Sequence, residues 1–339
     1  MKESNEKPTL TQWKELYDAA MRIRRLAPWG FLWDTELVVL NLPGREEPVY
    51  CSVMGRNKEC YAIGVYPGYQ SVDSFYRMAE SSANKMPLNA GLGQESLMCH
   101  FGDREEVEQE DRDIYKALGL RFRGRNEWIY FRTMEPGFYP WPIRAWEADL
   151  LIQVLDNLDH LLLYFVRENV QVDFENGETL LRSYSQEEGA WRNEVIAMPP
   201  RLLITPMMIV GNDLLIAKLK KCKRNGACLE FDVSYLPVPV RENKDDRPYF
   251  PRIALVMDRN ANLLIDQFTA SIDDPIETAV LEMLKRYIID YGRPMSINVR
   301  DDLSTRYIGD FCQKLGITLI EGEGIPAIDS LLEGLLSSL

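Results

Sequence analysis

The chain has little of what metal sites and disulfide frameworks are built from. Its 339 residues contain two histidines and six cysteines, and no two cysteines are spaced as C-x-x-C. A structural zinc site therefore lacks its usual ligand pattern. The cysteines are scattered, several of them in apolar segments, where a free thiol behaves as a small hydrophobic group. This usage argues against disulfides and is typical of a reducing compartment, so we expect a cytoplasmic protein.

Long apolar runs are also missing. The chain begins with the polar run Met1-Lys-Glu-Ser-Asn-Glu-Lys-Pro8, which has none of the apolar character of a secretory signal. No later stretch approaches the ~20 apolar residues that span a bilayer. We therefore expect neither a signal peptide nor a membrane partner.

Basic residues are fewer than acidic ones, which gives a formal net charge of -13 at pH 7. Broad affinity for nucleic acid or anionic membranes depends on clustered Lys and Arg, so we do not expect a nucleic-acid partner. The one dense basic cluster, residues 218–224, lies at the end of a predicted helix, where cations complement the helix dipole. The composition still permits a local basic groove.

The common catalytic signatures are absent as well. The chain has no GxxxxGK phosphate loop, no GxSxG elbow and no HExxH zinc motif. The two histidines, His100 and His160, lie in different sequence contexts without a catalytic pattern nearby. Function must therefore be sought in less familiar arrangements.

What the chain does contain is three segments with different patterns. Residues 1–167 alternate predicted helices with short strands, from an amphipathic helix that carries Trp13 and Leu16 to a long helix ending near Arg167. We predict an α+β domain here. Residues 168–247 are predicted to form a mixed, β-rich middle segment that ends in a charged linker bounded by prolines.

Residues 248–339 have the clearest order of elements. An apolar strand ends at Asp258, and a second strand follows it. A helix then begins with an acid, a proline and a glutamate in the capping order, Asp274-Pro275-Ile-Glu277. The next predicted strand ends at Asp301, and two helices separated by a strand follow it. This alternation predicts an α/β domain.

This layout resembles the ribonuclease H-like fold. Gly292-Arg-Pro294 leads a strand into Asp301, and Pro326 is followed by Glu333, as in the integrases and transposases of that superfamily. In the superfamily, acids on the first strand, at the end of the fourth strand and on a later helix bind divalent metals. The resemblance implies an α/β domain of ribonuclease H-like order.

By the same resemblance, Asp258, Asp301 and Glu333 are candidate catalytic residues and candidate ligands for Mg²⁺ or Mn²⁺. Such hard cations take carboxylate oxygens, and a pair of them about 4 Å apart clamps the attacking and leaving oxygens of a phosphodiester.

The segment also departs from that family's pattern. Asp301 is followed by Asp302-Leu303 where members usually have Asp-Asn-Gly, and no clear third strand precedes the helix at Pro275. In the alternative interpretation, Asp258 opens a turn, Asp302 caps a helix and Glu333 is a solvated helix residue. Fold alone does not decide between the two.

The densest aromatic stretch runs from Trp128 to Trp141 and follows three alternating arginines. The alternation predicts an exposed strand face that holds an anion or protects a sheet edge. The aromatic side chains suit a groove for a peptide or a nucleic-acid base, although such rings more often belong to a core. The candidate binding residues are Arg121, Arg123, Arg125, Trp128, Tyr139 and Trp141.

The first segment also resembles a bacterial domain family of unknown function. The residues that carry this resemblance are Trp13, Pro28-Trp29, Tyr50, Val53-Met-Gly55, Gly64-Val-Tyr-Pro-Gly68, Leu118-Gly-Leu-Arg-Phe-Arg-Gly124 and Pro136-Gly-Phe-Tyr-Pro-Trp141. In that group such domains occur beside other uncharacterised domains, so the resemblance implies a modular bacterial protein and no particular activity.

Two function hypotheses follow. The first is a non-catalytic interaction or ligand-binding protein of the bacterial cytoplasm, without a cofactor and with a protein or small-molecule partner. The alternative is a metal-dependent phosphodiesterase or nuclease. The enzyme requires its three carboxylates to converge on one open pocket, whereas the binding protein should have them dispersed, or paired with Arg259 or Arg300. The sequence leaves the oligomeric state open.

Overall fold

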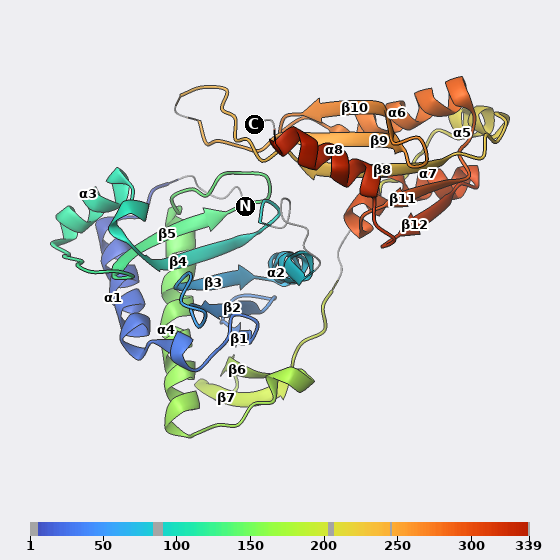
Figure 1. Ribbon diagram of the computed structural model, residues 1–339. Coiled ribbons are helices and arrows are strands. Elements are labelled where there is room, and N and C mark those ends of the chain that lie inside the picture. The colour runs from blue at the N-terminus through green and yellow to red at the C-terminus, as the bar shows by residue number, and fades with distance from the viewer. Residues whose placement is uncertain (1–5, 84–90, 203–206, 245, 338–339) are drawn as a thin grey trace. The chain divides into compact units, whose positions relative to one another are not determined.

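The computed structural model describes residues 6–83, 91–202, 207–244 and 246–337, which form two compact units (Figure 1). The first unit comprises Met1–Pro136 and Pro140–Leu203, and the second comprises Gly137–Tyr139 and Ile204–Leu339. Each unit contains one mixed sheet with its own hydrophobic core. The predicted fold class, α+β followed by α/β of ribonuclease H-like order, is confirmed.

The first unit is built on a seven-stranded sheet with the strand order β5-β4-β3-β2-β1-β6-β7. Every neighbouring pair is antiparallel except β1 and β6, which run parallel. The strands are β1 (Val38–Asn41), β2 (Val49–Met54), β3 (Ala62–Pro67), β4 (Ser96–Gly102), β5 (Trp128–Met134), β6 (Glu178–Ser185) and β7 (Ala190–Ala197).

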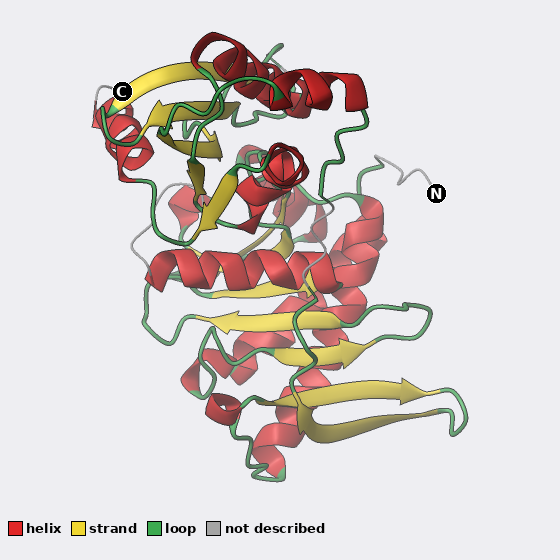
Figure 2. Cartoon of the chain, turned by 90° about the vertical axis from the view of Figure 1, so that its right-hand side faces the viewer, coloured by secondary structure: helices red, strands yellow, loops and turns green. Residues whose placement is uncertain are grey.

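Helices cover both faces of this sheet. The helices are α1 (Leu10–Leu26), α2 (Tyr69–Ala83), α3 (Gln109–Leu118) and α4 (Ala145–Arg167), with short 3-10 turns η1 (Pro28–Gly30), η2 (Arg104–Glu106) and η3 (Phe174–Asn176). Helices α1 and α4 pack against each other and share one core with alternate strand residues such as Val49 and Cys51. Tyr50, between those two, belongs to the smaller core under α2. Figure 2 shows the strands side by side with helices behind them.

The middle segment is not a domain of its own. Its hairpin, β6 and β7, extends the first sheet through the parallel pairing of β6 with β1. The rest of the segment lies in the second unit, because β8 (Cys228–Tyr235) is that unit's central strand. The predicted boundary at residue 247 therefore differs from the division in the structure, which falls between Leu203 and Ile204.

The second unit has a five-stranded sheet with the order β10-β9-β8-β11-β12. The first three strands in sequence pair antiparallel, and β11 and β12 run parallel to β8. Numbered from β8, this order is 3-2-1-4-5, which is the ribonuclease H-like order. The other strands are β9 (Arg252–Asp258), β10 (Leu263–Ala270), β11 (Ser296–Val299) and β12 (Thr318–Glu321).

This numbering corrects the assignment of the first strand. The sequence suggested that the apolar strand ending at Asp258 comes first, which left the third strand missing. In the structure that strand is β9, the second of the fold, and β10 is the third. Helix α6 (Ile276–Tyr291) then follows a third strand, β10, so the third strand that the sequence appeared to lack is present.

The helices of the second unit divide between the two faces of its sheet. They are α5 (Asp213–Lys220), α6 (Ile276–Tyr291), α7 (Asp302–Leu315) and α8 (Pro326–Ser337). One face of the sheet, with Leu229 and Phe231 of β8, packs under α5, α6 and α7. The other face, with Leu255 of β9, packs under Ile328 of α8. Across the described residues of both units, no helix combines the length and apolarity that a bilayer crossing requires.

Candidate functional site

Asp258 lies at the end of β9, where its side chain shapes a turn. Its Oδ1 accepts hydrogen bonds from the backbone N–H groups of Asn260, at 2.9 Å, and Ala261, at 2.8 Å. A carboxylate bonded in this way to the residues that follow it is a typical turn former. The turn joins β9 to β10.

Asp301 caps a helix, and it does so one residue earlier than the sequence suggested. Its Oδ1 accepts from the N–H of Ser304 at 3.1 Å, so Asp301 is the N-cap of α7 and Asp302 is the first helical residue. Caps of this kind satisfy one of the free N–H groups at a helix start. Glu333 is an exposed residue of α8.

The register of the sheet separates Asp258 from Asp301. Asp258 pairs with Leu229 of β8, which in turn pairs with Ile297 near the start of β11. Asp301 comes four residues after Ile297, beyond the other end of β11, which is about 13 Å along the strand direction. Among the described residues, no three His, Cys, Asp or Glu side chains are grouped to hold a metal ion.

The structure brings a different set of charged residues together, on the face of β8 that looks toward α8. The strand alternates strictly, with apolar residues on one face and Glu230, Asp232 and Ser234 on the other. These three polar side chains are 0%, 2% and 4% exposed. Buried carboxylates require compensation, because an unpaired buried charge is costly.

Asp232 is compensated by three donors. Its Oδ2 accepts from Nε of Arg300 at 2.9 Å and from Oγ of Ser234 at 2.6 Å, while its Oδ1 accepts from Oγ of Ser304 at 2.7 Å. Arg300 immediately follows β11, and its Nη2 donates to Oδ1 of Asp329, on α8, at 2.8 Å. One guanidinium thus joins the first strand, the end of the fourth strand and the last helix.

Burial acts to lower the pKa of Arg300, but the carboxylates of Asp232 and Asp329 outweigh it and raise that pKa above its ordinary value. The guanidinium is therefore permanently charged in this network. Charge-assisted hydrogen bonds of this kind are stronger than neutral ones.

Glu230 lies on the same face of β8, two residues before Asp232. Its Oε2 accepts from the N–H of Ile328 at 2.9 Å, which places a carboxylate at the N-terminus of α8. Its Oε1 lies 3.7 Å from Nη1 of Arg259 and has no hydrogen-bond donor among the described residues. Burial raises the pKa of Glu230, against the opposing effects of Ile328 and Arg259.

These residues do not fit a divalent metal site. The resemblance assigns ligands to the first strand, the end of the fourth strand and a later helix. Asp232 and Asp329 lie at the first and last of those places, but Arg300 comes at the end of the fourth strand and binds both acids. A metal ion there would face the fixed positive charge of Arg300, and both oxygens of Asp232 already accept hydrogen bonds from protein groups.

The sequence contains one signal for this network, on the strand that became β8. The run Cys-Leu-Glu-Phe-Asp-Val-Ser-Tyr, residues 228–235, has acids at alternate positions of a strand whose other face is apolar. A strand with one apolar face and buried carboxylates on the other needs cations from its neighbours. Arg300 could not be assigned to it, because the pairing of β11 with β8 is a long-range contact.

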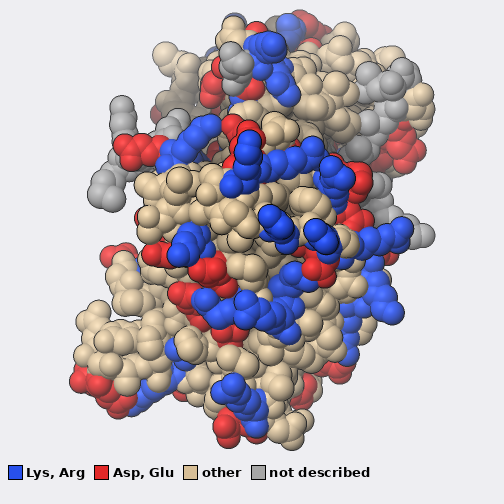
Figure 3. Space-filling view, turned by 90° about the vertical axis from the view of Figure 1, so that its left-hand side faces the viewer, with Lys and Arg blue, Asp and Glu red and all other residues tan. Residues whose placement is uncertain are grey.

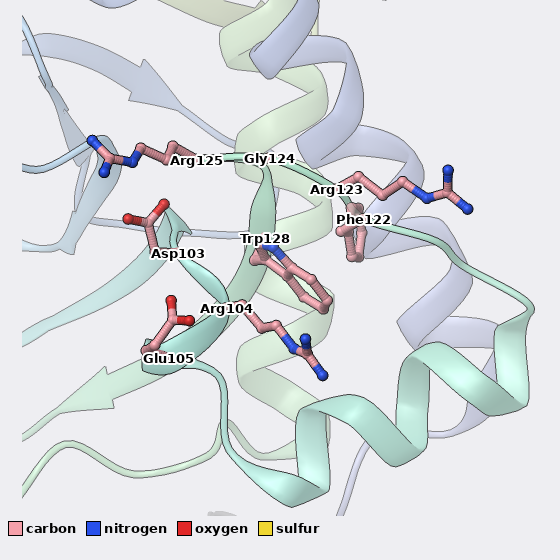
Figure 4. Close-up of a pocket in the computed structure, with 8 residues that line it drawn as sticks. All are labelled: Asp103, Arg104, Glu105, Phe122, Arg123, Gly124, Arg125 and Trp128. Atoms are coloured by element: carbon pink, nitrogen blue, oxygen red, sulfur yellow. The ribbon is translucent and has the colours of Figure 1, made fainter.

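A second candidate region lies in the first unit, where the loop between α3 and β5 meets η2. Arg123, Arg125 and Trp128, three of the predicted binding residues, line one cavity of about 700 Å³. Figure 4 shows Trp128 and Phe122 at its centre. The segment that carries the arginines is a loop and not the predicted strand, because residues 120–127 pair with no other strand.

The other predicted binding residues lie elsewhere. Arg121 is exposed on the same loop but does not line the cavity. Trp141 pairs through its backbone with Thr133 of β5. Tyr139 belongs to the second unit, where its N–H donates to the carbonyl of Pro248 and its ring lies 6.5 Å from that of Phe250.

Local backbone geometry fixes the shape of the cavity. Gly124 has a φ of +101°, and a side chain there would also approach Glu127 to 3.1 Å, so only glycine suits the position. The turn that follows is tied to η2 by a 2.8 Å hydrogen bond from the N–H of Asn126 to Oδ1 of Asp103. Phe122 is anchored from below by Tyr115, whose ring centroid lies 4.9 Å away.

The cavity brings in a residue that the sequence did not suggest. Arg104 of η2 joins Arg123 and Arg125 from a separate segment of the chain. Within the parts of the chain that the structure describes, none of these three guanidinium groups lies within ion-pair distance of a carboxylate. Asp103 and Glu105 also line the cavity.

Comparison with known protein families assigns both units. Residues 13–182, half of the chain, match a family model described as a domain of unknown function (DUF7309), and the chain belongs to this family. Residues 215–336 match a second model, also described as a domain of unknown function (DUF6930). A search of curated proteins finds no match.

Solved structures with some similarity are retroviral integrases. The HTLV-2 integrase catalytic core domain in complex with magnesium, in its trimeric form, is 12% identical with a TM-score of 0.25, over 35% of this chain and 72% of that one. The core domain of BIV integrase is 16% identical with a TM-score of 0.22, over 32% and 63%.

The simian T-cell lymphotropic virus intasome in complex with a PP2A regulatory subunit is 14% identical with a TM-score of 0.24. That match covers 36% of this chain, which spans only 43% of the length of the intasome chain. Likenesses at this level say nothing about activity.

Proposed function

We propose that this protein is a non-catalytic binding protein of the bacterial cytoplasm, in which the ribonuclease H-like unit serves as a scaffold. The observation that carries the proposal is the position of Arg300. It follows the fourth strand and binds Asp232 on the first strand and Asp329 on the last helix, which are two of the elements on which metal-dependent members of the superfamily carry their ligands.

The chemistry supports this function over hydrolysis. Two-metal catalysis needs carboxylate oxygens that are open to cations and to a phosphodiester. Here Asp232 is 2% exposed and accepts three hydrogen bonds from protein groups. The guanidinium supplies a positive charge where a metal would bring its own, and it engages Oδ2 of Asp232 and Oδ1 of Asp329.

The cytoplasmic assignment agrees with the state of the cysteines. All six are free thiols, and burial raises the pKa values of Cys51, Cys99 and Cys312 well above their ordinary range. Buried neutral thiols of this kind pack as apolar groups and need no oxidising compartment.

The test is a hydrolysis assay with Mn²⁺ on single-stranded DNA, duplex DNA and RNA–DNA hybrids. Wild type and Asp232→Asn should be equally inactive, so that any trace of cleavage is the same in both preparations. Cleavage by the wild type that Asp232→Asn abolishes, while Asp258→Asn retains it, would overturn the proposal in favour of a nuclease. Asp258 is the matched control, because it is an acid of the same sheet that only shapes a turn.

A further inference from the structure

The cavity beside Trp128 has two chemically different sides. In Figure 4, Arg104 and Arg123 extend to one side of the indole, and the carboxylates of Asp103 and Glu105 lie on the other. Arg125 extends toward the carboxylate side. The floor between the two sides is aromatic, made of Trp128 and Phe122.

The cationic side is suited to a phosphate. All of its charges are arginines, whose planar guanidinium groups match phosphate oxygens in pairs. They are exposed and lack ion-pair partners among the described residues, so binding an anion would break no existing contact. Figure 3 shows the side of the molecule on which α1 and α3 lie, where many Lys and Arg side chains are exposed, with Asp and Glu between them.

The aromatic floor and the acidic side exclude a bare anion as the best ligand. Tyr115 supports Trp128 and Phe122 from below, with its ring centroid 6.1 Å and 4.9 Å from theirs, so the two rings form a fixed platform. A flat ring gains stacking energy on such a platform. Asp103 and Glu105 offer acceptor oxygens to the hydroxyl and amino groups of a nucleoside, and their negative charge disfavours a ligand that is only an anion.

We propose that this cavity binds a mononucleotide, with its base against Trp128, its phosphate between Arg104 and Arg123, and its hydroxyl or amino groups toward Asp103 and Glu105. The cavity volume of about 700 Å³ accommodates a ligand of this size. This inference rests on the proposed binding function and names its ligand class.

The experiment is calorimetric titration of the full chain with AMP, with adenosine and inorganic phosphate as component probes. AMP should bind with a Kd between about 10 µM and 1 mM, and each component at least about tenfold more weakly. Arg123→Ala should weaken AMP binding about tenfold or more, because it removes a charge-assisted pair. Trp128→Leu should weaken AMP binding and leave the weak phosphate binding unchanged.

Arg121→Ala is the matched control. It removes the same charge from the same loop at a position that does not line the cavity, so AMP binding should stay within about twofold. The unfolding midpoint of Arg123→Ala, followed by tryptophan fluorescence, should equal that of the wild type, because the side chain is exposed and makes no ion pair.

The inference is overturned if AMP shows no binding up to millimolar concentration. It is also overturned if Arg121→Ala weakens binding as much as Arg123→Ala, or if phosphate or adenosine alone binds as tightly as AMP. None of these outcomes touches the non-catalytic function of the second unit, which fails only if hydrolysis depends on Asp232.

Discussion

Nε of Arg300 donates a hydrogen bond to Oδ2 of Asp232 across 2.9 Å, from the residue after the fourth strand to the middle of the first. The same guanidinium reaches Asp329 on the last helix at 2.8 Å. The three positions coincide with those that a ribonuclease H-like fold uses for metal ligands. A side-chain cation thus holds the two acids together, and under the proposed function it stands where the enzymes of that fold hold metal ions.

Arg300→Ala should destabilise the second unit. The substitution leaves Asp232 buried without its cation, and breaking a buried pair in this way costs about 3 kcal/mol. Hydrogen exchange of the β8 and α8 amides, measured by mass spectrometry, should accelerate accordingly.

Arg286→Ala is the control for that prediction. Arg286 pairs with Asp266 at 2.8 Å, but its side chain is 62% exposed, and such pairs contribute no more than about 1 kcal/mol. Equal exchange rates in Arg300→Ala and Arg286→Ala would show that the Arg300 network contributes no more to stability than an exposed ion pair.

Stability of the first unit should fall between pH 6.5 and pH 4 through His100. Burial, assisted by Arg132, lowers the pKa of His100 to about 4, and its ring stacks on Tyr130 at 4.7 Å. Because the folded-state pKa is depressed, the stabilisation is complete above the unfolded pKa of about 6.5 and is lost as pH falls toward 4. The full loss is roughly 3 kcal/mol.

Denaturant unfolding followed by tryptophan fluorescence measures this directly, since all seven tryptophans lie in the first unit. His100→Phe keeps an aromatic ring and should flatten the pH dependence, whereas a change at the exposed His160, such as His160→Gln, should not. An identical pH profile for wild type and His100→Phe would refute the prediction.

Gly124→Ala should disturb the loop that forms the cavity in the first unit. A φ of +101° is strained for any residue with a side chain, at a cost of about 1–3 kcal/mol, and the new methyl group meets Glu127. We expect a lower unfolding midpoint by tryptophan fluorescence. Gly30→Ala, where a methyl group meets nothing within 4 Å and φ is not positive, should leave the midpoint unchanged or slightly raised.

Patterns that depend on neighbours in sequence predicted most of the fold. Residues 49–54 form β2 as expected, because a short, mostly apolar run bounded by turns has few alternatives to a buried strand. The predicted cap of α7, Asp302, lies one residue after the N-cap in the structure, Asp301. Aspartate is a good cap at either position, and only the backbone geometry selects one.

Features that depend on contacts distant in sequence could not be predicted. Arginine at every second position, from Arg121 to Arg125, gives the same pattern in a strand and in an exposed loop, and only the absence of a partner strand distinguishes them. Arg104 joins Arg123 through the folding of η2 against the loop. Likewise, Asp232 could not be identified as the first-strand acid until β8 was known to be the central strand.

The most direct test of the account is a calorimetric titration of Mn²⁺ into the wild type and into Arg300→Ser. We predict no saturable binding by the wild type up to millimolar concentration, because the guanidinium already occupies the space between Asp232 and Asp329 and binds both. Arg300→Ser keeps both acids and should gain Mn²⁺ binding that Asp232→Asn in the same background removes. Saturable micromolar binding by the wild type, lost in Asp232→Asn, would contradict the account.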